Sequence, residues 1–233
     1  ETFQGYLRAN GDAGIRNEIW IINTVGCVNK STERIAAAAS ARAYRGIDGV
    51  YGFSHPFGCS QLGDDLANTQ KILAGLASHP NAGAVLVLGL GCENNHIEAF
   101  RKALGPTDSG RVLFLNAQDV EDEVEEGLRL VGTLAEYAGR FRRSAVPVDK
   151  LRVGLKCGGS DGFSGITANP LLGRFSDRLA RQGGSVLMTE VPEMFGAESP
   201  LMDRAVTQDV FDRAASMING FKAYYEKHGQ PVY

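Results

Sequence analysis

The chain has 233 residues, of which 43% are hydrophobic, so it is long enough for one large domain or two small ones with a substantial core. Its formal net charge of −3 gives no indication of nucleic acid or of an anionic membrane surface as a partner, and neither is expected. The sequence has no apolar stretch of the ~20 residues that span a bilayer and no signal-peptide pattern, so we expect a cytoplasmic protein.

Six short apolar runs are predicted as strands that alternate with predicted helices. The expected strands cover residues 18–24, 49–53, 84–90, 111–116, 151–156 and 185–189. The expected helices run from about 31 to 43, 65 to 78, 96 to 104, 119 to 143 and 206 to 228, with another after the glycine-rich stretch near 165. Strands that alternate with helices pair in parallel through right-handed crossovers. The sequence therefore predicts a doubly wound α/β fold of Rossmann or flavodoxin-like type, a three-layer sandwich. Its mostly parallel sheet would have about six strands in a single domain over residues 1–233.

Residues 151–170, LRVGLKCGGSDGFSGITANP, are expected to form a strand, a glycine-rich loop and the start of a helix. Backbone N–H groups at such a turn favour an anion such as a carboxylate. The dinucleotide and nucleotide-triphosphate fingerprints are absent, which makes a flavodoxin-like nucleotide binder a weak alternative. A strand-to-helix turn that simply needs glycine remains open as an explanation.

Each cysteine of the chain follows a predicted strand: Cys27, Cys59, Cys92 and Cys157. They lie far apart with no C-x-x-C pair, which is typical of cytosolic thiols rather than of a disulfide framework. Because ligands gather at the carboxyl ends of parallel strands, we expect all four thiols at one edge of the sheet. Such thiols could hold iron, zinc or an iron–sulfur cluster, together with the other potential ligands of these loops: His55, His96, Asp64, Glu93 and Asp161. Alternatively, each cysteine packs as a small hydrophobic residue.

Four motifs carry a resemblance to a known family: GYLRANGDAGIRNE, GLGCENN, KCGGSDGFSGITANP and TEVPEMFGAE. They resemble the altronate and galactarate dehydratase family, which also includes the large subunit of a sulfolactate sulfo-lyase. The resemblance covers nearly the whole chain. It implies a hydro-lyase that removes water from a sugar acid to give a keto-deoxy acid, with iron as a ferrous ion or in an iron–sulfur cluster. A sulfo-lyase acting on sulfolactate and a non-catalytic acid-binding or assembly domain are the alternatives.

The implied reaction needs a base that takes the α-proton and an acid that protonates the leaving hydroxyl. The candidates for these roles are, in order, His55, Asp161 and Lys156. A metal held by the four cysteines would stabilise the negative charge that develops as the proton leaves. Arg8 and Arg16 are candidate carboxylate clamps, although an ordinary surface arginine is the more common case for either one taken alone. The full set of candidate substrate-binding residues is Arg16, Asn17, Gly158, Gly159, Ser160 and Asn169.

Family members are usually longer, with further domains on either side, so the resemblance implies that this chain is the central fragment of a longer enzyme. Its expected partners are those flanking domains and a small-molecule sugar acid. We expect the fragment alone to be inactive or nearly so, because a lyase site has to exclude water. The oligomeric state stays open, a homo-oligomer included.

Overall fold

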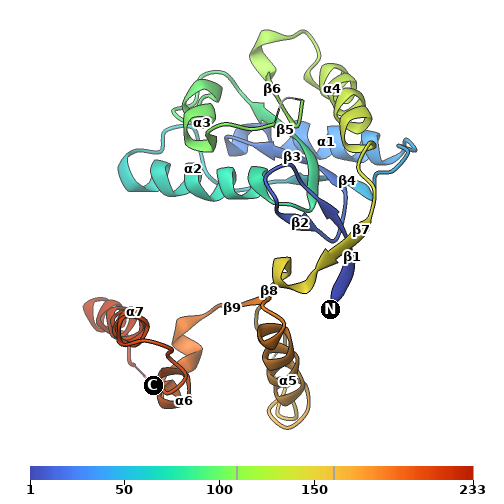
Figure 1. The fold of residues 1–233 in the computed structure, drawn as a ribbon. Helices are drawn as coiled ribbons and strands as arrows, with labels where there is room; N and C mark the ends of the chain where they lie inside the picture. Colours follow the sequence, from blue (N-terminus) through green and yellow to red (C-terminus); the bar gives the residue numbers. More distant parts are fainter. Residues whose placement is uncertain (109, 160, 233) are drawn as a thin grey trace. The chain divides into compact units, whose positions relative to one another are not determined.

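The computed structural model describes residues 1–108, 110–159 and 161–232 of the chain (Figure 1). The chain divides into two compact units, Glu1–Lys150 and Leu151–Tyr233. The sequence predicted a single domain, whereas the structure has two units, each of which is described by itself below. None of the helices in the described residues is both long enough and apolar enough to cross a membrane.

The first unit is built on a four-stranded parallel sheet with the strand order β4-β3-β5-β6. Its strands are β3 (Glu18–Asn23), β4 (Gly49–Phe53), β5 (Ala82–Gly89) and β6 (Val112–Asn116). Every residue of β5 is buried, as expected for a central strand of a sheet that is covered on both faces. The predicted parallel pairing is therefore confirmed for these strands.

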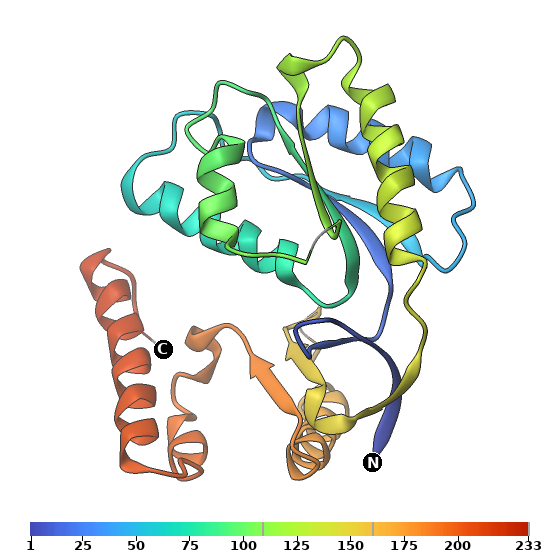
Figure 2. The same cartoon turned by 45° about the horizontal axis from the view of Figure 1, so that its top comes forward.

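Two pairs of helices cover the two faces of this sheet (Figure 2). One face packs against α1 (Asn29–Ser40) and α4 (Glu123–Ala138), and the other against α2 (Gly63–Ser78) and α3 (Ile97–Leu104). Successive residues of β3 serve the two cores in turn, with Ile19 on the α1–α4 side and Trp20 on the α2–α3 side. The three-layer α/β sandwich is thus confirmed.

A second, antiparallel sheet in the first unit was not predicted from the sequence. Its order is β2-β1-β7, and its strands are β1 (Thr2–Leu7), β2 (Ala13–Gly14) and β7 (Ser144–Pro147). The β1–β2 turn contains Gly11 at φ +84°, a conformation that glycine adopts without strain. The first strand of the chain therefore pairs with a segment that lies after α4.

The second unit contains a separate two-stranded parallel sheet, formed by β8 (Arg152–Leu155) and β9 (Ser185–Met188). Its helices are α5 (Ala168–Arg181), η4 (Val191–Met194), α6 (Glu198–Met202) and α7 (Gln208–Lys227). The expected sheet of about six strands is thus wrong, because the parallel sheet of the first unit has four. A reason lies in β8, whose Arg152 and Gly154 are exposed, whereas a central parallel strand is buried on both faces.

Candidate functional site

Three of the four cysteines follow the carboxyl ends of strands in the four-stranded sheet, as the sequence predicted. Cys27 follows β3, Cys59 lies between β4 and α2, and Cys92 lies between β5 and α3. The Cys92 loop is tied to the Cys59 loop, because the Asn94 backbone N–H donates a hydrogen bond to the Cys59 carbonyl at 2.9 Å. Cys157 belongs to the second unit, where it follows β8.

All four cysteines are exposed free thiols, so the alternative that each packs as a small buried hydrophobic residue is wrong. Among the residues that the structure describes, the three thiols of the first unit do not form a cluster with other metal-binding side chains. Within the described residues, one set of three potential ligands has its donor atoms within 4.8 Å of one another: Cys157, Glu190 and Glu193. A metal site shared by all four cysteines therefore stays a prediction without a cluster to support it.

His55, the first candidate base, lies at the same edge of the first unit as Cys27 and Cys59. Its Nε2 atom is 2.9 Å from the Asn23 carbonyl oxygen, and its Nδ1 atom accepts the Phe57 backbone N–H at 3.2 Å. These partners fit a neutral imidazole that carries its proton on Nε2. To act as a base, His55 would have to give up the hydrogen bond from the Phe57 N–H and accept a substrate proton on Nδ1.

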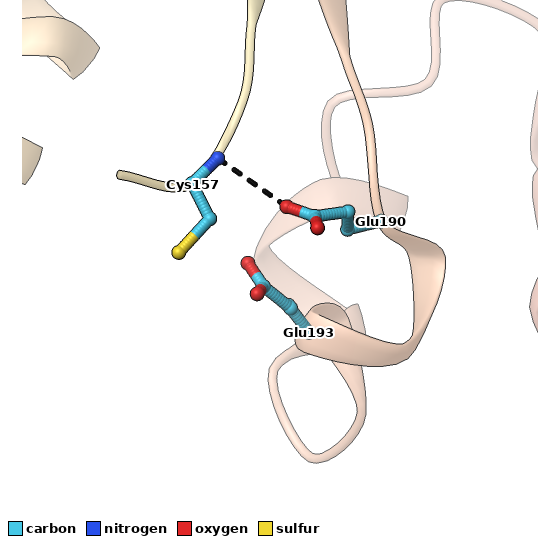
Figure 3. Close-up of side chains that lie close together, drawn as sticks. All are labelled: Cys157, Glu190 and Glu193. Atoms are coloured by element: carbon cyan, nitrogen blue, oxygen red, sulfur yellow. Dashed lines mark hydrogen bonds between the residues drawn. The ribbon is translucent and has the colours of Figure 1, made fainter. Parts of the chain in front are cut away.

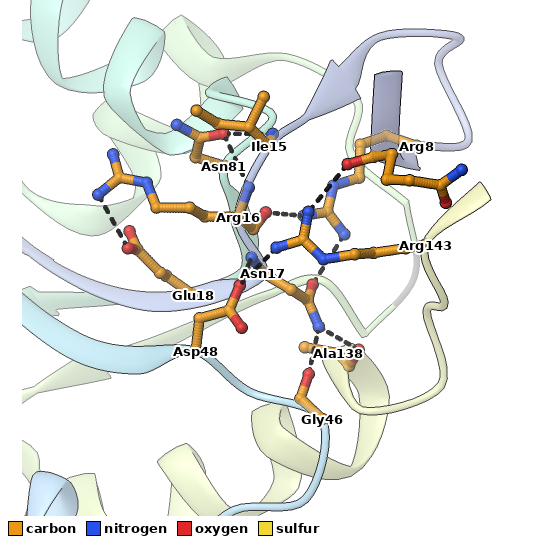
Figure 4. A network of polar contacts seen from close by, with 11 residues as sticks. Arg8, Ile15, Arg16, Asn17, Glu18, Gly46, Asp48, Asn81, Ala138 and Arg143 are labelled. Atoms are coloured by element: carbon orange, nitrogen blue, oxygen red, sulfur yellow. Dashed lines mark hydrogen bonds and ion pairs between the residues drawn. The ribbon is translucent and has the colours of Figure 1, made fainter. Parts of the chain in front are cut away.

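Asn17 lies at the opposite, amino end of β3, and its side chain is fully engaged within the protein (Figure 4). Its amide group donates to the carbonyls of Gly46 and Ala138 at 2.7 and 2.9 Å. Its Oδ1 atom accepts a hydrogen bond from Arg8 at 2.9 Å, and the residue is 0% exposed. The structure therefore gives this predicted substrate ligand a packing role, and it does not bring Asn17 together with the cysteine loops.

Arg8 is a buried cation of this amino-end network. Its guanidinium donates to the carbonyls of Pro80 at 2.7 Å and Arg16 at 3.0 Å, and it lies over the ring of Phe141. Burial, together with the positive charge of Arg111, lowers the pKa of Arg8 to about 10, so it remains protonated at neutral pH. Arg16 forms an ion pair with Glu18 at 3.1 Å beside this network (Figure 4).

In the second unit, the paired strands β8 and β9 bring a thiol and two carboxylates together (Figure 3). Leu155 pairs with Met188, and Cys157 and Glu190 each lie two residues beyond that pair. The Cys157 backbone N–H donates to Glu190 Oε2 at 3.3 Å. Glu193 comes from the one-turn helix η4 that follows Glu190.

Glu190 adopts φ +66° and ψ +64°, the left-handed conformation that is costly for a residue with a side chain. Among the described non-glycine residues it alone has a positive φ. Lys156 holds this carboxylate through an ion pair of 2.9 Å. The hydrogen bond and the charge of Glu190 raise the pKa of Lys156, while the hydrogen bond from Lys156 lowers the pKa of Glu190. Lys156 is therefore protonated at neutral pH, which argues against it as the base.

The glycine-rich loop after β8 carries the remaining predicted residues, of which Ser160 lies outside the described residues. A Cβ atom at Gly158 or Gly159 would meet no atom within 4 Å, and neither residue has a positive φ. The glycines are thus not required by strain or by crowding within the unit itself. Asp161 accepts the Phe163 backbone N–H at 2.9 Å, and the Asn169 N–H donates to the Ser164 carbonyl at 2.8 Å.

Glu190 and Glu193 are the candidate residues that sequence reasoning missed. They lie in the TEVPEMFGAE motif, directly after the last predicted strand, so the rule applied to the cysteines would have selected them. Both also line a cavity of about 800 Å³ in the second unit. Its other lining residues are Pro192, Phe221, Tyr224, Tyr225, His228 and Gln230. The volume is within the range of small-molecule sites.

Comparison with known proteins matches the two units to two different domains of one enzyme family. Residues 5–139 match the model of the D-galactarate dehydratase/altronate hydrolase second domain, and residues 148–233 match that of the D-galactarate/altronate dehydratase C-terminal domain. These segments coincide closely with the two compact units of the structure.

Relatives with curated names agree with these matches. The chain is 54% identical to the altronate dehydratase of Bacillus subtilis, over 100% of this chain and 47% of the relative. It is 50% identical to the altronate dehydratase of Escherichia coli, over 99% and 47%. A galactarate dehydratase of Escherichia coli is 32% identical over 96% of this chain and 45% of the relative. The chain thus spans about half the length of these relatives. It belongs to the D-galactarate/altronate dehydratase family.

Proposed function

We propose that the protein is a metal-assisted hydro-lyase that removes water from a sugar acid, with altronate as the first candidate substrate and galactarate as the second. The observation that carries this proposal is the Cys157–Glu190–Glu193 group beside the cavity of the second unit. The substrate class follows from the printed names of the relatives, of which the two most similar given above are altronate dehydratases. Because the chain spans only part of those relatives, the proposal concerns the full-length protein.

The donor atoms of the group are compatible with a ferrous ion. A thiolate and two carboxylates combine one soft and two hard ligands, a set that suits a divalent transition metal better than magnesium or calcium. Such an ion, when bound, would act as a Lewis acid toward an oxygen of the substrate. Three protein donors leave coordination positions for other oxygen atoms. The iron–sulfur cluster that the sequence also suggested finds less support, because the cysteines of the first unit do not lie in a ligand cluster among the described residues.

The protein's own residues can supply the charges that a dehydration needs. Lys156 stays protonated beside Glu190 and can attract the carboxylate of a sugar acid. Asp161, in the exposed loop that follows, keeps the second place among the candidate bases. His55 is the candidate base of the first unit, with a lone pair on Nδ1 that is bound by one backbone N–H. Lys156 is better suited to the role of acid or of a fixed positive charge.

The proposed setting is the cytoplasm, with a small sugar acid and the remaining domains of the full-length protein as partners. A sulfo-lyase activity is the second candidate. The chain is 29% identical to the sulfolactate sulfo-lyase subunit beta of Chromohalobacter salexigens, over 97% of this chain and 56% of the relative. Elimination of a C–S bond next to a carboxylate needs the same base and the same charge stabilisation as dehydration.

The test uses full-length protein, purified without oxygen, stripped of metal and reloaded with ferrous ion. We expect it to convert altronate to the corresponding keto-deoxy acid faster than galactarate or sulfolactate. Cys157→Ser should lower the bound iron per chain at least about tenfold, whereas Cys27→Ser, the matched control, should keep wild-type iron content. Absence of turnover of all three acids by the iron-loaded protein would refute the proposed function. Equal iron loss in both variants would refute the assignment of the metal to Cys157.

A further inference from the structure

The loop between β5 and α3 contains a buried carboxylate whose partners are all polar and neutral. Glu93 is 3% exposed, and no ion pair with a lysine or arginine is found for it among the described residues. Its Oε1 atom accepts hydrogen bonds from the Thr24 hydroxyl at 2.5 Å and the Leu90 N–H at 3.1 Å. Its Oε2 atom accepts the Gly91 N–H at 2.7 Å.

These hydrogen bonds keep the buried carboxylate charged. Burial by itself raises the pKa of Glu93, but the bonds from Thr24, Gly91 and Leu90 outweigh it and lower the pKa below its usual value. A buried charge is costly unless several donors satisfy it, so the position is specific for a carboxylate. A glutamine cannot replace it, because either orientation of its amide turns an N–H toward a backbone N–H of Gly91 or Leu90.

The residues around Glu93 connect its loop to the other two loops of this edge. Asn95 donates to the Thr24 carbonyl at 3.0 Å. Asn94 donates to the carbonyls of Cys59 and Gln61, each at 2.9 Å. Thr24 also directly follows Asn23, whose carbonyl oxygen lies 2.9 Å from His55 Nε2. The Glu93 carboxylate is thus linked through Thr24 to the strand end that orients His55.

The position of the Glu93 carboxylate also depends on the absence of a side chain at Gly89. A Cβ atom at Gly89 would lie 3.0 Å from Glu93 Oε1, closer than most real contacts of this kind. Gly91, next in the loop, has φ +125°, and the bond from its N–H to Glu93 fixes that turn. The end of β5 therefore has room for this carboxylate, and the carboxylate in turn binds the backbone N–H groups of the following turn.

We infer that Glu93 is a positioning residue of the proposed lyase: its bonds to Thr24 and to the Leu90 and Gly91 amides fix the ends of β3 and β5. The loop that presents His55 and Cys59 is held in turn by the adjacent residues Asn23 and Asn94. The inference rests on the proposed function. It assigns Glu93 no contact with substrate, and it gives the Glu and both Asn residues of GLGCENN a structural role.

The test compares Glu93→Gln with Glu98→Gln in the full-length protein. Glu98 is the matched control, because it is an exposed glutamate of α3 that contacts His96 through its side chain. Hydrogen exchange should accelerate at least about tenfold at the Leu90 and Gly91 amides in Glu93→Gln and stay unchanged in the control. In the same variant kcat should fall at least about tenfold while KM changes less than about threefold, because the substrate contacts are intact.

Four outcomes would overturn the inference. Faster exchange with a wild-type kcat would show that Glu93 has a structural role only and would overturn the inference. Unchanged exchange in Glu93→Gln would also overturn it, because the carboxylate would then not hold the loop. If Glu93→Gln does not fold, Thr24→Val removes only the hydroxyl donor, and a kcat within about twofold of wild type would then overturn it. If the wild-type protein turns over none of the acids, the proposed function fails first, and catalytic positioning fails with it.

Discussion

Replacing Asn17 with alanine separates a packing role from the substrate-binding role that the sequence suggested. The substitution removes two hydrogen bonds to the carbonyls of Gly46 and Ala138 and leaves one N–H of the buried Arg8 guanidinium without its acceptor. Each buried group that loses its partner costs about 1–3 kcal/mol, more when it is charged. The free energy of unfolding of the first unit should therefore fall by about 3–5 kcal/mol.

The single tryptophan of the chain makes this measurable. Trp20 is buried in the α2–α3 core of the first unit, so its fluorescence during urea denaturation follows that unit. Asn10→Ala is the control, because Asn10 is exposed and hydrogen-bonds Asp12, and it should change the free energy by less than about 0.5 kcal/mol. A loss below about 1 kcal/mol in Asn17→Ala, together with a raised KM in the full-length protein, would refute the packing role.

Three further predictions follow from single residues. Gly159→Ala should leave the free energy of unfolding within about 0.5 kcal/mol of wild type, because the added Cβ meets no atom and the residue's φ is not positive. A fall of at least about tenfold in kcat/KM of the full-length protein would therefore indicate a ligand beside Gly159, whereas a normal kcat/KM would show that the loop is only a turn. Burial and a hydrogen bond to Asp108 raise the pKa of Tyr137 to about 12 from its ordinary value of 10.0. The folded state therefore favours the protonated hydroxyl, and the stability that this hydroxyl contributes is complete below pH 10.0 and is lost as the pH rises to about 12. Tyr137→Phe should flatten that loss in urea titrations, and an unchanged pH slope would contradict the assignment. Leu86→Ala, at a fully buried position of β5, should cost about 2–5 kcal/mol by the same fluorescence assay, and a cost below about 1 kcal/mol would show that the sheet is not packed as described.

The layered fold of the first unit was predictable because its signals are local. The apolar run that became β5 has no polar residue, which is typical of a strand that is buried on both faces. Helix ends were less accurate. The helix expected from 119 to 143 begins at Glu123, where Asp122 accepts the N–H groups of Val124 and Glu125, and it ends at Ala138, before Gly139. The residue at which a helix begins depends on which side chain caps it, and the periodic hydrophobic pattern carries no information about capping.

Partner choice between distant strands was not predictable from the local pattern. The runs that became β8 and β9 look like those of the first unit, but they pair with each other in a separate sheet. The same limit applies to the candidate site. The cysteines could be placed because each follows a strand, whereas the group of Cys157 with Glu190 and Glu193 depends on the pairing of β8 with β9. The burial of Asn17 was not predictable, because a polar residue before a strand gives no sign of being buried.

The pairing of β1 with β7 brings the two ends of the first unit side by side. Thr2 is the register partner of Pro147, and the Val148 N–H donates to the Glu1 carbonyl at 3.1 Å. A module whose ends meet can be inserted into a loop of another protein, or circularly permuted, without stretching its chain. Joining Glu1 to Lys150 through a short glycine linker and opening the chain in the exposed 54–60 loop would therefore preserve every strand of its parallel sheet. Gene fusion and domain shuffling are thus topologically easy for this unit.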